Sequence, residues 1–125
     1  MVQVLKDAMA KLIRIAKDAE VLTAGAQTTT NSYADLSGSK IDTTNATSVS
    51  FVVKNTGGSN GAYWKIVGSN DDSSYVDVNS EATLAAGVSA SYATAQAVYR
   101  YYKVQIKAQV GGSQTTVSAV ALAKV

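Results

Sequence analysis

SVSFVVK, residues 48–54, is the stretch that decides the fold, because its residues alternate between apolar and polar with a period close to two. In a strand, Val49, Phe51 and Val53 would share one face and the intervening residues the other. Such alternation is typical of a strand that buries only one face. The stretch ends in a cluster of turn-forming residues, NTGGSNG at 55–61.

The same period continues along the rest of the chain. In AYWKIVG, residues 62–68, Trp64 and Ile66 fall on one side of the predicted strand. A second turn cluster, SNDDSS at 69–74, follows it. Further strands are expected at 75–78, 82–84, 88–92, 98–110 and 115–125.

About seven to eight short strands separated by Gly, Asn, Asp and Ser turns, without a helical pattern between them, predict antiparallel sheets. We therefore expect an all-β domain over residues 25–125, an antiparallel β-sandwich or jelly roll. The last strand, 115–125, has apolar residues on both faces. It is expected either to lie in the middle of a sheet that is covered twice or to meet another chain.

Residues 1–24 form a different part of the chain. Seven of the 19 residues from Val2 to Glu20 are charged, against 13 of the 105 from Val21 onward. Apolar residues recur there at intervals of three and four, which predicts one amphipathic helix from residue 2 to about 20, followed by a tether at 23–32. This helix would dock on its own domain or on another chain. Its expected docking residues are Leu5, Met9, Leu12, Ile15 and Leu22.

The composition excludes most catalytic chemistry. The chain has no His, no Cys and no Pro. Without His and Cys there is no catalytic triad of the usual kind, no structural zinc site and no disulfide. We expect no catalytic residue, no cofactor and no metal ion, so an enzyme is the weakest class, since it would depend on Asp, Glu, Lys, Tyr or Ser alone.

The charge pattern argues against nucleic-acid and membrane partners. The formal net charge is +2, which is too small to steer the chain toward nucleic acid or an anionic membrane. Charged residues interrupt the N-terminal apolar stretch every few positions, so no signal peptide is expected. No run approaches about 18 uncharged apolar residues, and no membrane span is expected.

Two groups of residues are candidates for binding. Asp71 and Asp72, in the turn at 69–74, offer oxygen ligands to calcium, although such residues more often hydrogen-bond their own backbone in a turn. Tyr99, Tyr101 and Lys103 would share one strand face. Exposed rings of this kind could stack on sugars or bases, or simply cover neighbouring strands.

Two segments together carry a resemblance: WKIVGSNDDSSY at 64–75 and YRYYKVQI at 99–106. They resemble small β-sandwich proteins of tailed-phage virions and, more distantly, discoidin-like modules. The resemblance implies a multicopy structural protein of the virion, such as a capsid decoration, head-fibre or tail subunit, made in the host cytoplasm. Its implied partners are other copies of itself and the major capsid protein. The alternative is a discoidin-like or carbohydrate-binding module that uses the turns at 55–60 and 70–74.

Overall fold

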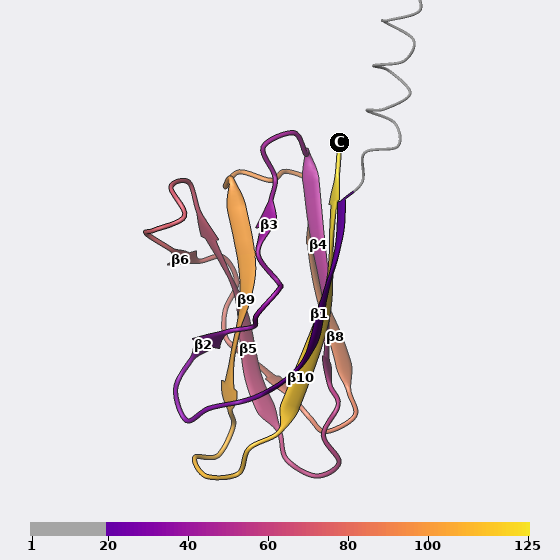
Figure 1. Cartoon of the computed structure of the whole chain (residues 1–125), viewed down its shortest axis with the longest axis vertical. Coiled ribbons are helices and arrows are strands. Elements are labelled where there is room, and N and C mark those ends of the chain that lie inside the picture. The colour runs from indigo at the N-terminus through magenta and orange to yellow at the C-terminus, as the bar shows by residue number, and fades with distance from the viewer. Residues whose placement is uncertain (1–19) are drawn as a thin grey trace, which may run out of the picture.

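The computed structural model describes residues 20–125, which form ten strands in two antiparallel sheets (Figure 1). Sheet A contains β1 (Glu20–Thr28), β10 (Thr116–Lys124), β4 (Ser48–Asn55) and β8 (Ser89–Thr94), in that spatial order. Sheet B is built around two long strands, β9 (Tyr101–Ala108) and β5 (Ala62–Ser69). Its short strands are β2 (Ala34–Asp35), β3 (Ile41–Asp42), β6 (Val76–Asp77) and β7 (Ala82–Leu84).

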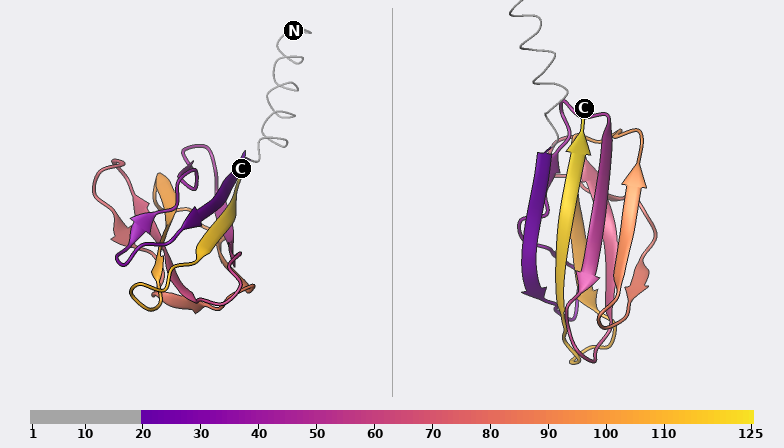
Figure 2. Two further views of the ribbon diagram at one scale, coloured as in Figure 1. Left: turned by 60° about the horizontal axis from the view of Figure 1, so that its bottom comes forward. Right: turned by 90° about the vertical axis from the view of Figure 1, so that its right-hand side faces the viewer.

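The short strands of sheet B act as two interrupted strands. Both β2 and β3 pair with β9, and both β6 and β7 pair with β5. Counted in this way, two sheets of four strands face each other, and the chain crosses between the sheets at every connection except the one from β5 to β6. This topology is a jelly roll, which confirms the predicted all-β sandwich (Figure 2).

The core lies between the two sheets and follows from the alternation in the sequence. Val49, Phe51 and Val53 of β4 point inward and are completely or almost completely buried. Trp64 and Ile66 of β5 meet them from sheet B, as the pattern predicted. Burial of such side chains contributes about 1.5–3 kcal/mol each. Sheet A adds Val117 and a series of alanines from β10 to this core.

The predicted strands agree with the structure in position. Residues 48–54, 62–68, 82–84 and 115–125 correspond to β4, β5, β7 and β10 with ends that differ by at most one residue. The strand predicted at 98–110 is shorter at both ends, because β9 begins at Tyr101 and ends at Ala108. The last strand, β10, lies inside sheet A between β1 and β4, which accounts for the apolar residues of its inner face.

The predictions for the N-terminal part divide at Glu20. Residues 1–19, with Leu5, Met9, Leu12 and Ile15, lie outside the described residues. The assignment of Leu22 to the helix is wrong, because Leu22 belongs to β1, pairs with Ala121 and packs against the core. The tether predicted at 23–32 is also wrong for residues 23–28, which continue β1 beside β10. In the part of the chain that the structure describes, no helix is long and apolar enough to cross a membrane.

Candidate interaction surfaces

The outer face of sheet B carries most of the charge of the described residues. Lys65 on β5 and Lys103 and Lys107 on β9 alternate with buried core residues and therefore point outward. Each of these lysines has a carboxylate partner: Asp77 at 3.0 Å, Asp35 at 2.7 Å and Glu81 at 3.7 Å. Two further ion pairs belong to the same sheet: Lys40–Asp72 joins two of its loops, and Arg100, just before β9, pairs with Asp42 of β3.

Tyrosine rings cover these ammonium groups. Lys65 Nζ lies 4.4 Å from the centre of the Tyr33 ring, and Lys103 Nζ lies 3.8 Å from that of Tyr75. Burial raises the pKa of Tyr33, and the hydrogen bond from its hydroxyl to Glu81 raises it further. This face is therefore a closed network in which cations already have both aromatic and anionic neighbours, and little charge is left over for a ligand.

The three residues predicted to form a stacking surface do not share one face. Tyr101 and Lys103 lie on the outer side of β9 and are half-buried. Tyr99 precedes the strand, packs against the core and meets the buried Tyr102 ring edge to face at 5.9 Å. The prediction for Tyr99 was wrong because the strand begins two residues after it, so the alternation of β9 does not include it. The Lys103 ammonium group already forms an ion pair with Asp35 and lies over the Tyr75 ring.

The acidic turn is held by its own hydrogen bonds. The Asp71 carboxylate accepts bonds from the backbone N–H groups of Ser73 and Ser74 and from the Ser69 hydroxyl. The backbone bonds and then the hydroxyl bond hold the pKa of Asp71 below its usual value. Asp72 instead pairs with Lys40 and accepts a bond from the Tyr75 hydroxyl. The described residues hold no group of three or more acidic side chains arranged for a metal ion.

The outer face of sheet A is different in kind. On its four strands the charged residues are Glu20, Lys54 and Lys124, none of which forms an ion pair within the described residues. Apolar side chains occupy neighbouring positions on this face and form what we call the outer patch: Val21, Val52, Ala93, Val120 and Leu122.

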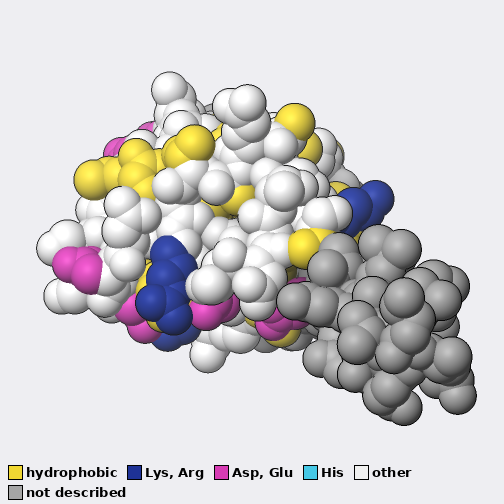
Figure 3. Space-filling view, turned by 90° about the horizontal axis from the view of Figure 1, so that it is seen from above, with side chains coloured by type: hydrophobic (Ala, Val, Ile, Leu, Met, Phe, Trp, Pro, Cys, Tyr) yellow, Lys and Arg dark blue, Asp and Glu magenta, His cyan; other side chains and the backbone are white. Residues whose placement is uncertain are grey.

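The outer patch follows the strand register. Val120 lies directly opposite Val52, and Leu122 directly opposite Val21. Val21, Val52 and Val120 are 60%, 50% and 44% exposed, which is high for valines on a sheet. Seen from the end where the C-terminus lies, one group of basic side chains lies beside acidic ones and another lies apart from them, while hydrophobic side chains gather in more than one place (Figure 3).

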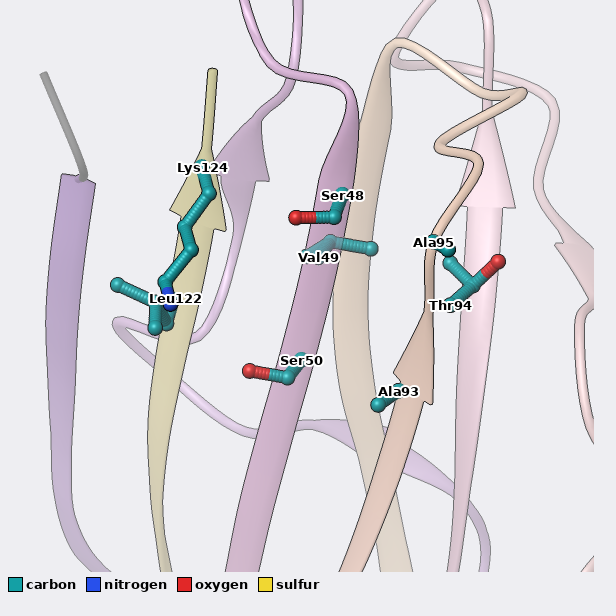
Figure 4. Close-up of a pocket in the computed structure, with 8 residues that line it drawn as sticks. All are labelled: Ser48, Val49, Ser50, Ala93, Thr94, Ala95, Leu122 and Lys124. Atoms are coloured by element: carbon teal, nitrogen blue, oxygen red, sulfur yellow. The ribbon is translucent and has the colours of Figure 1, made fainter. Parts of the chain in front are cut away.

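A shallow hollow of about 270 Å³ adjoins the outer patch at that end of sheet A. It runs over β10, β4 and β8, and Ser50 and Leu122 lie on its floor (Figure 4). Its other lining residues are small or end in a single amine: Ser48, Val49, Ala93, Thr94, Ala95 and Lys124. The lining mixes apolar side chains with three hydroxyl groups and one amine, and it holds no pair of groups suited to acid–base chemistry.

Sequence reasoning missed the outer patch as a unit. The only signal was the two-sided apolar character of 115–125, which pointed to a second covered face. The contributions of Val21 and Val52 depend on β1 and β4 lying on either side of β10, which is a matter of topology.

Comparison with solved structures shows the fold. A protein from the work "Bacillus endospore appendages form a novel family of disulfide-linked pili" matches with a TM-score of 0.53 and 16% identity, over 86% of this chain and 87% of that one. The PBSX exported protein XepA matches with a TM-score of 0.63 and 13% identity, over 89% of this chain but only 38% of its own length. PirA matches with a TM-score of 0.53 and 8% identity, over 78% of this chain and 90% of that one.

The sequence itself gives a family. No curated protein matches the chain. A family model matches residues 42–124, which run from β3 to the end of β10 and make up about two thirds of the sequence. The chain belongs to the family described as Domain of unknown function (DUF6385).

Proposed function

We propose that this protein is a multicopy structural subunit of a tailed-phage virion, a capsid decoration or a related head or tail component. The observation that carries the proposal is the contrast between its two outer faces. Sheet B neutralises its charges internally, whereas sheet A presents the outer patch without any ion pair on it. An apolar sheet face of this kind is a contact surface for another protein.

The outer patch is suited to close packing against a flat partner. Apart from Leu122, its side chains are short or β-branched, and serines and threonines surround them. Covering the three half-exposed valines would contribute roughly 1 kcal/mol each from burial of apolar surface. Repeated over many copies in one particle, a modest contact of this size is sufficient because the contacts act together.

The solved structures that share the fold are consistent with such a role. One of them forms pili, which are assemblies of many copies, and another is an exported protein of PBSX. In this proposal Leu5, Met9, Leu12 and Ile15 anchor or oligomerise the subunit and the sandwich forms its outer body. The partners are further copies of the chain and the major capsid protein, and the protein acts without catalysis, cofactor or metal.

The carbohydrate-binding alternative has less support. The turns at 55–60 and 70–74 that it would use precede and follow β5, so they lie at opposite ends of that strand. Of the neighbouring side chains, Tyr99 packs inward and Lys103 is already paired with Asp35. Binding of a glycan would have to displace these contacts.

The proposal is tested in two steps. Purified particles of the phage that encodes the chain are analysed by quantitative mass spectrometry, and the chain is expected in many copies per particle. The Val52→Lys and Val120→Lys variants are then compared with the unchanged protein for incorporation into particles and for self-association by light scattering. Each added charge is expected to weaken association at least tenfold, about 1.4 kcal/mol.

Val76→Lys is the matched control, because Val76 is 49% exposed on β6 of sheet B, compared with 50% for Val52. It is expected to leave incorporation unchanged. Absence of the chain from purified particles would overturn the proposal, and so would equal incorporation of all three variants.

A further inference from the structure

The edges of the two sheets are protected to different degrees. Sheet B ends on both sides in strands of two or three residues, β2 and β3 on one edge and β6 and β7 on the other. Short, charged edge strands of this kind prevent pairing with other chains. Sheet A ends in β1, with nine residues, and β8, with six, and the only charge on either is Glu20 at the start of β1. Neither edge carries a Pro, and the bulge between Ala24 and Gln27 protects only the second half of β1.

The two edges of sheet A run in opposite directions. All neighbouring strands in the order β1-β10-β4-β8 are antiparallel. Because the number of strands is even, β8 of one copy placed beside β1 of the next copy, in the same orientation, forms an antiparallel pair (Figure 2). Neither copy has to turn over for this pairing.

The free hydrogen-bonding groups of β8 follow from its register with β4. Asn55 N–H donates to Val88 C=O at 3.0 Å, which fixes which residue pairs exchange hydrogen bonds. In an antiparallel ladder these pairs alternate, so Ala90 and Tyr92 bond to β4. The N–H and C=O groups of Ser89, Ser91 and Ala93 therefore point away from the sheet, and all three residues are exposed.

The same argument applies to β1. Thr56 N–H donates to Thr116 C=O, so the residues of β10 that bond to β1 are those that alternate with Thr116. Val21 and Thr23 then direct their backbone groups to the free edge. From Ala24 onward the edge is closed by a bulge and by the turn at Gly38, which packs beside Ala24. A Cβ added at Gly38 would also lie 3.9 Å from Thr23 C=O, so Val21 is the more open of the two positions.

The side-chain rows of the outer face select one register. Val21, Leu122, Ser50 and Ala93 form one row across the sheet, because each lies opposite the next. Thr23, Val120, Val52 and Ser91 form the neighbouring row. We propose that copies of the chain join head to tail, with β8 of one copy pairing with β1 of the next so that Ala93 lies opposite Val21 and Ser91 opposite Thr23.

This arrangement rests on the proposed multicopy role and gives it a geometry. Two hydrogen-bonded pairs form per contact, and both rows continue from one copy to the next, so the outer patches merge into one apolar surface. Neighbouring strands in a sheet are rotated by about 20–25°. A head-to-tail contact with such a rotation generates a ring or a helical array.

The test uses the absence of Cys from the chain, which gives a background without disulfides. Two single variants, Val21→Cys and Ala93→Cys, are prepared with tags of different mass and oxidised alone and as a mixture. Within one copy the two positions lie on opposite edges, about 14 Å apart across three strand spacings, so they cannot bond to each other. Between copies in the proposed register their Cα atoms lie about 5.5 Å apart, within disulfide range.

The oxidised mixture is expected to give at least ten times as much dimer that joins the two variants, the mixed dimer, as either variant gives of its own disulfide-linked dimer. A mixture of Val76→Cys and Ala93→Cys is the matched control, since Val76 is also well exposed, at 49% compared with 60% for Val21, but lies on sheet B, and it is expected to give only background yield. Adding Ser91→Pro to the Ala93→Cys variant removes one free-edge N–H without removing a bond inside the copy, and it is expected to abolish the mixed dimer. Emission from Trp64, the only Trp, verifies that each variant is folded.

Equal yields from the mixture and the control would overturn the proposal. Preferential disulfides between two Ala93→Cys copies would also overturn it, because they indicate a closed two-fold pairing of β8 with β8. If the chain is present in virions but no mixed dimer forms, the edge contact is wrong and the virion role stands. If the mixed dimer forms but particles lack the chain, the virion role is wrong.

Discussion

Replacing Asn55 by Ala is expected to be among the most destabilising single changes in the described part of the chain. Asn55 ends β4, is completely buried and uses its full bonding capacity. Its amide nitrogen donates to Asn60 C=O at 2.8 Å and to Leu84 C=O at 2.9 Å. Its amide oxygen accepts from Gly57 N–H at 3.0 Å and from the Thr115 hydroxyl at 2.7 Å.

The magnitude follows from the four groups that lose a partner. The bonds to Leu84 and Thr115 are buried, and leaving each of these groups without a partner costs about 1–3 kcal/mol. The other two bonds are only partly buried, so water replaces part of each, and their loss costs about 0.5–1 kcal/mol each. These costs add to about 3–8 kcal/mol, a large part of the 5–15 kcal/mol that stabilises a typical domain.

The assay is urea unfolding followed by the emission of Trp64, which is 3% exposed in the folded chain. The matched control is Thr56→Ala, one residue further on, whose hydroxyl bonds to Thr116 on the exposed side. Its loss is expected to cost less than about 1 kcal/mol, since water can replace an exposed bond.

A double-mutant cycle separates the hydrogen bonds from general damage. Thr115→Val is expected to cost about 1–2 kcal/mol less in the Asn55→Ala background than in the unchanged protein, because its hydroxyl has already lost its acceptor. A loss below about 1 kcal/mol for Asn55→Ala, or strict additivity with Thr115→Val, would refute the assignment of this cluster as a buried hub.

Three further predictions concern other parts of the fold. Gly68→Ala is expected to destabilise the chain by about 1–3 kcal/mol, because a Cβ would lie 2.6 Å from the Tyr99 ring, and calorimetry should show a smaller cost when Tyr99→Ala is also present. Burial alone would raise the pKa of Asp35, but bonds from Lys103 and Gln105 outweigh it and hold the pKa below its ordinary 3.8. The folded state therefore gains stability from ionised Asp35 above about pH 4 and loses it as the pH falls through the lowered pKa of Asp35. Because the chain has no His, the urea concentration at the unfolding midpoint is expected to stay constant between pH 6 and 8. If this midpoint fell with acid pH equally steeply in Asp35→Asn, the assignment would be contradicted. Asp72 has a φ of 59°, so Asp72→Ala is expected to cost about 1 kcal/mol and Asp72→Gly less. Both changes remove the bonds to Lys40 and Tyr75, so the reverse order in thermal unfolding would contradict the role assigned to the backbone conformation.

Sequence reasoning was most successful where a strand buries one face. The period of two in 48–54 and 62–68 placed Val49, Phe51, Trp64 and Ile66 in the core without any knowledge of their partners, because the pleat alone sends alternate side chains to opposite faces. Turn residues fixed the ends of these strands. The Asp71 turn was also predictable, since short polar side chains bond to the backbone two or three residues ahead.

Local pattern failed where pairing decides the structure. The segment VLTAGAQT, 21–28, has few strongly strand-forming residues, and it becomes part of β1 because it pairs with β10 on both sides of a bulge between Ala24 and Gln27. Tyr99 fits the alternation of the residues that follow it in the sequence, but it does not share their strand face. The reason is that β9 begins only at Tyr101, and the Tyr99 ring packs on Tyr102 instead.

Residue type and local period were sufficient to predict the fold class and the inner face of the main strands, and the composition alone excludes chemistry that needs His or Cys. Only the tertiary structure decided which strands are neighbours. That order brings Val21, Val52 and Val120 from three separate segments onto one face and gathers the ion pairs on the other. It also leaves β1 and β8 as edges that run in opposite directions. The reason is physical: a strand's own residues fix which side chains share a face, but non-local hydrogen bonds fix what lies beside them.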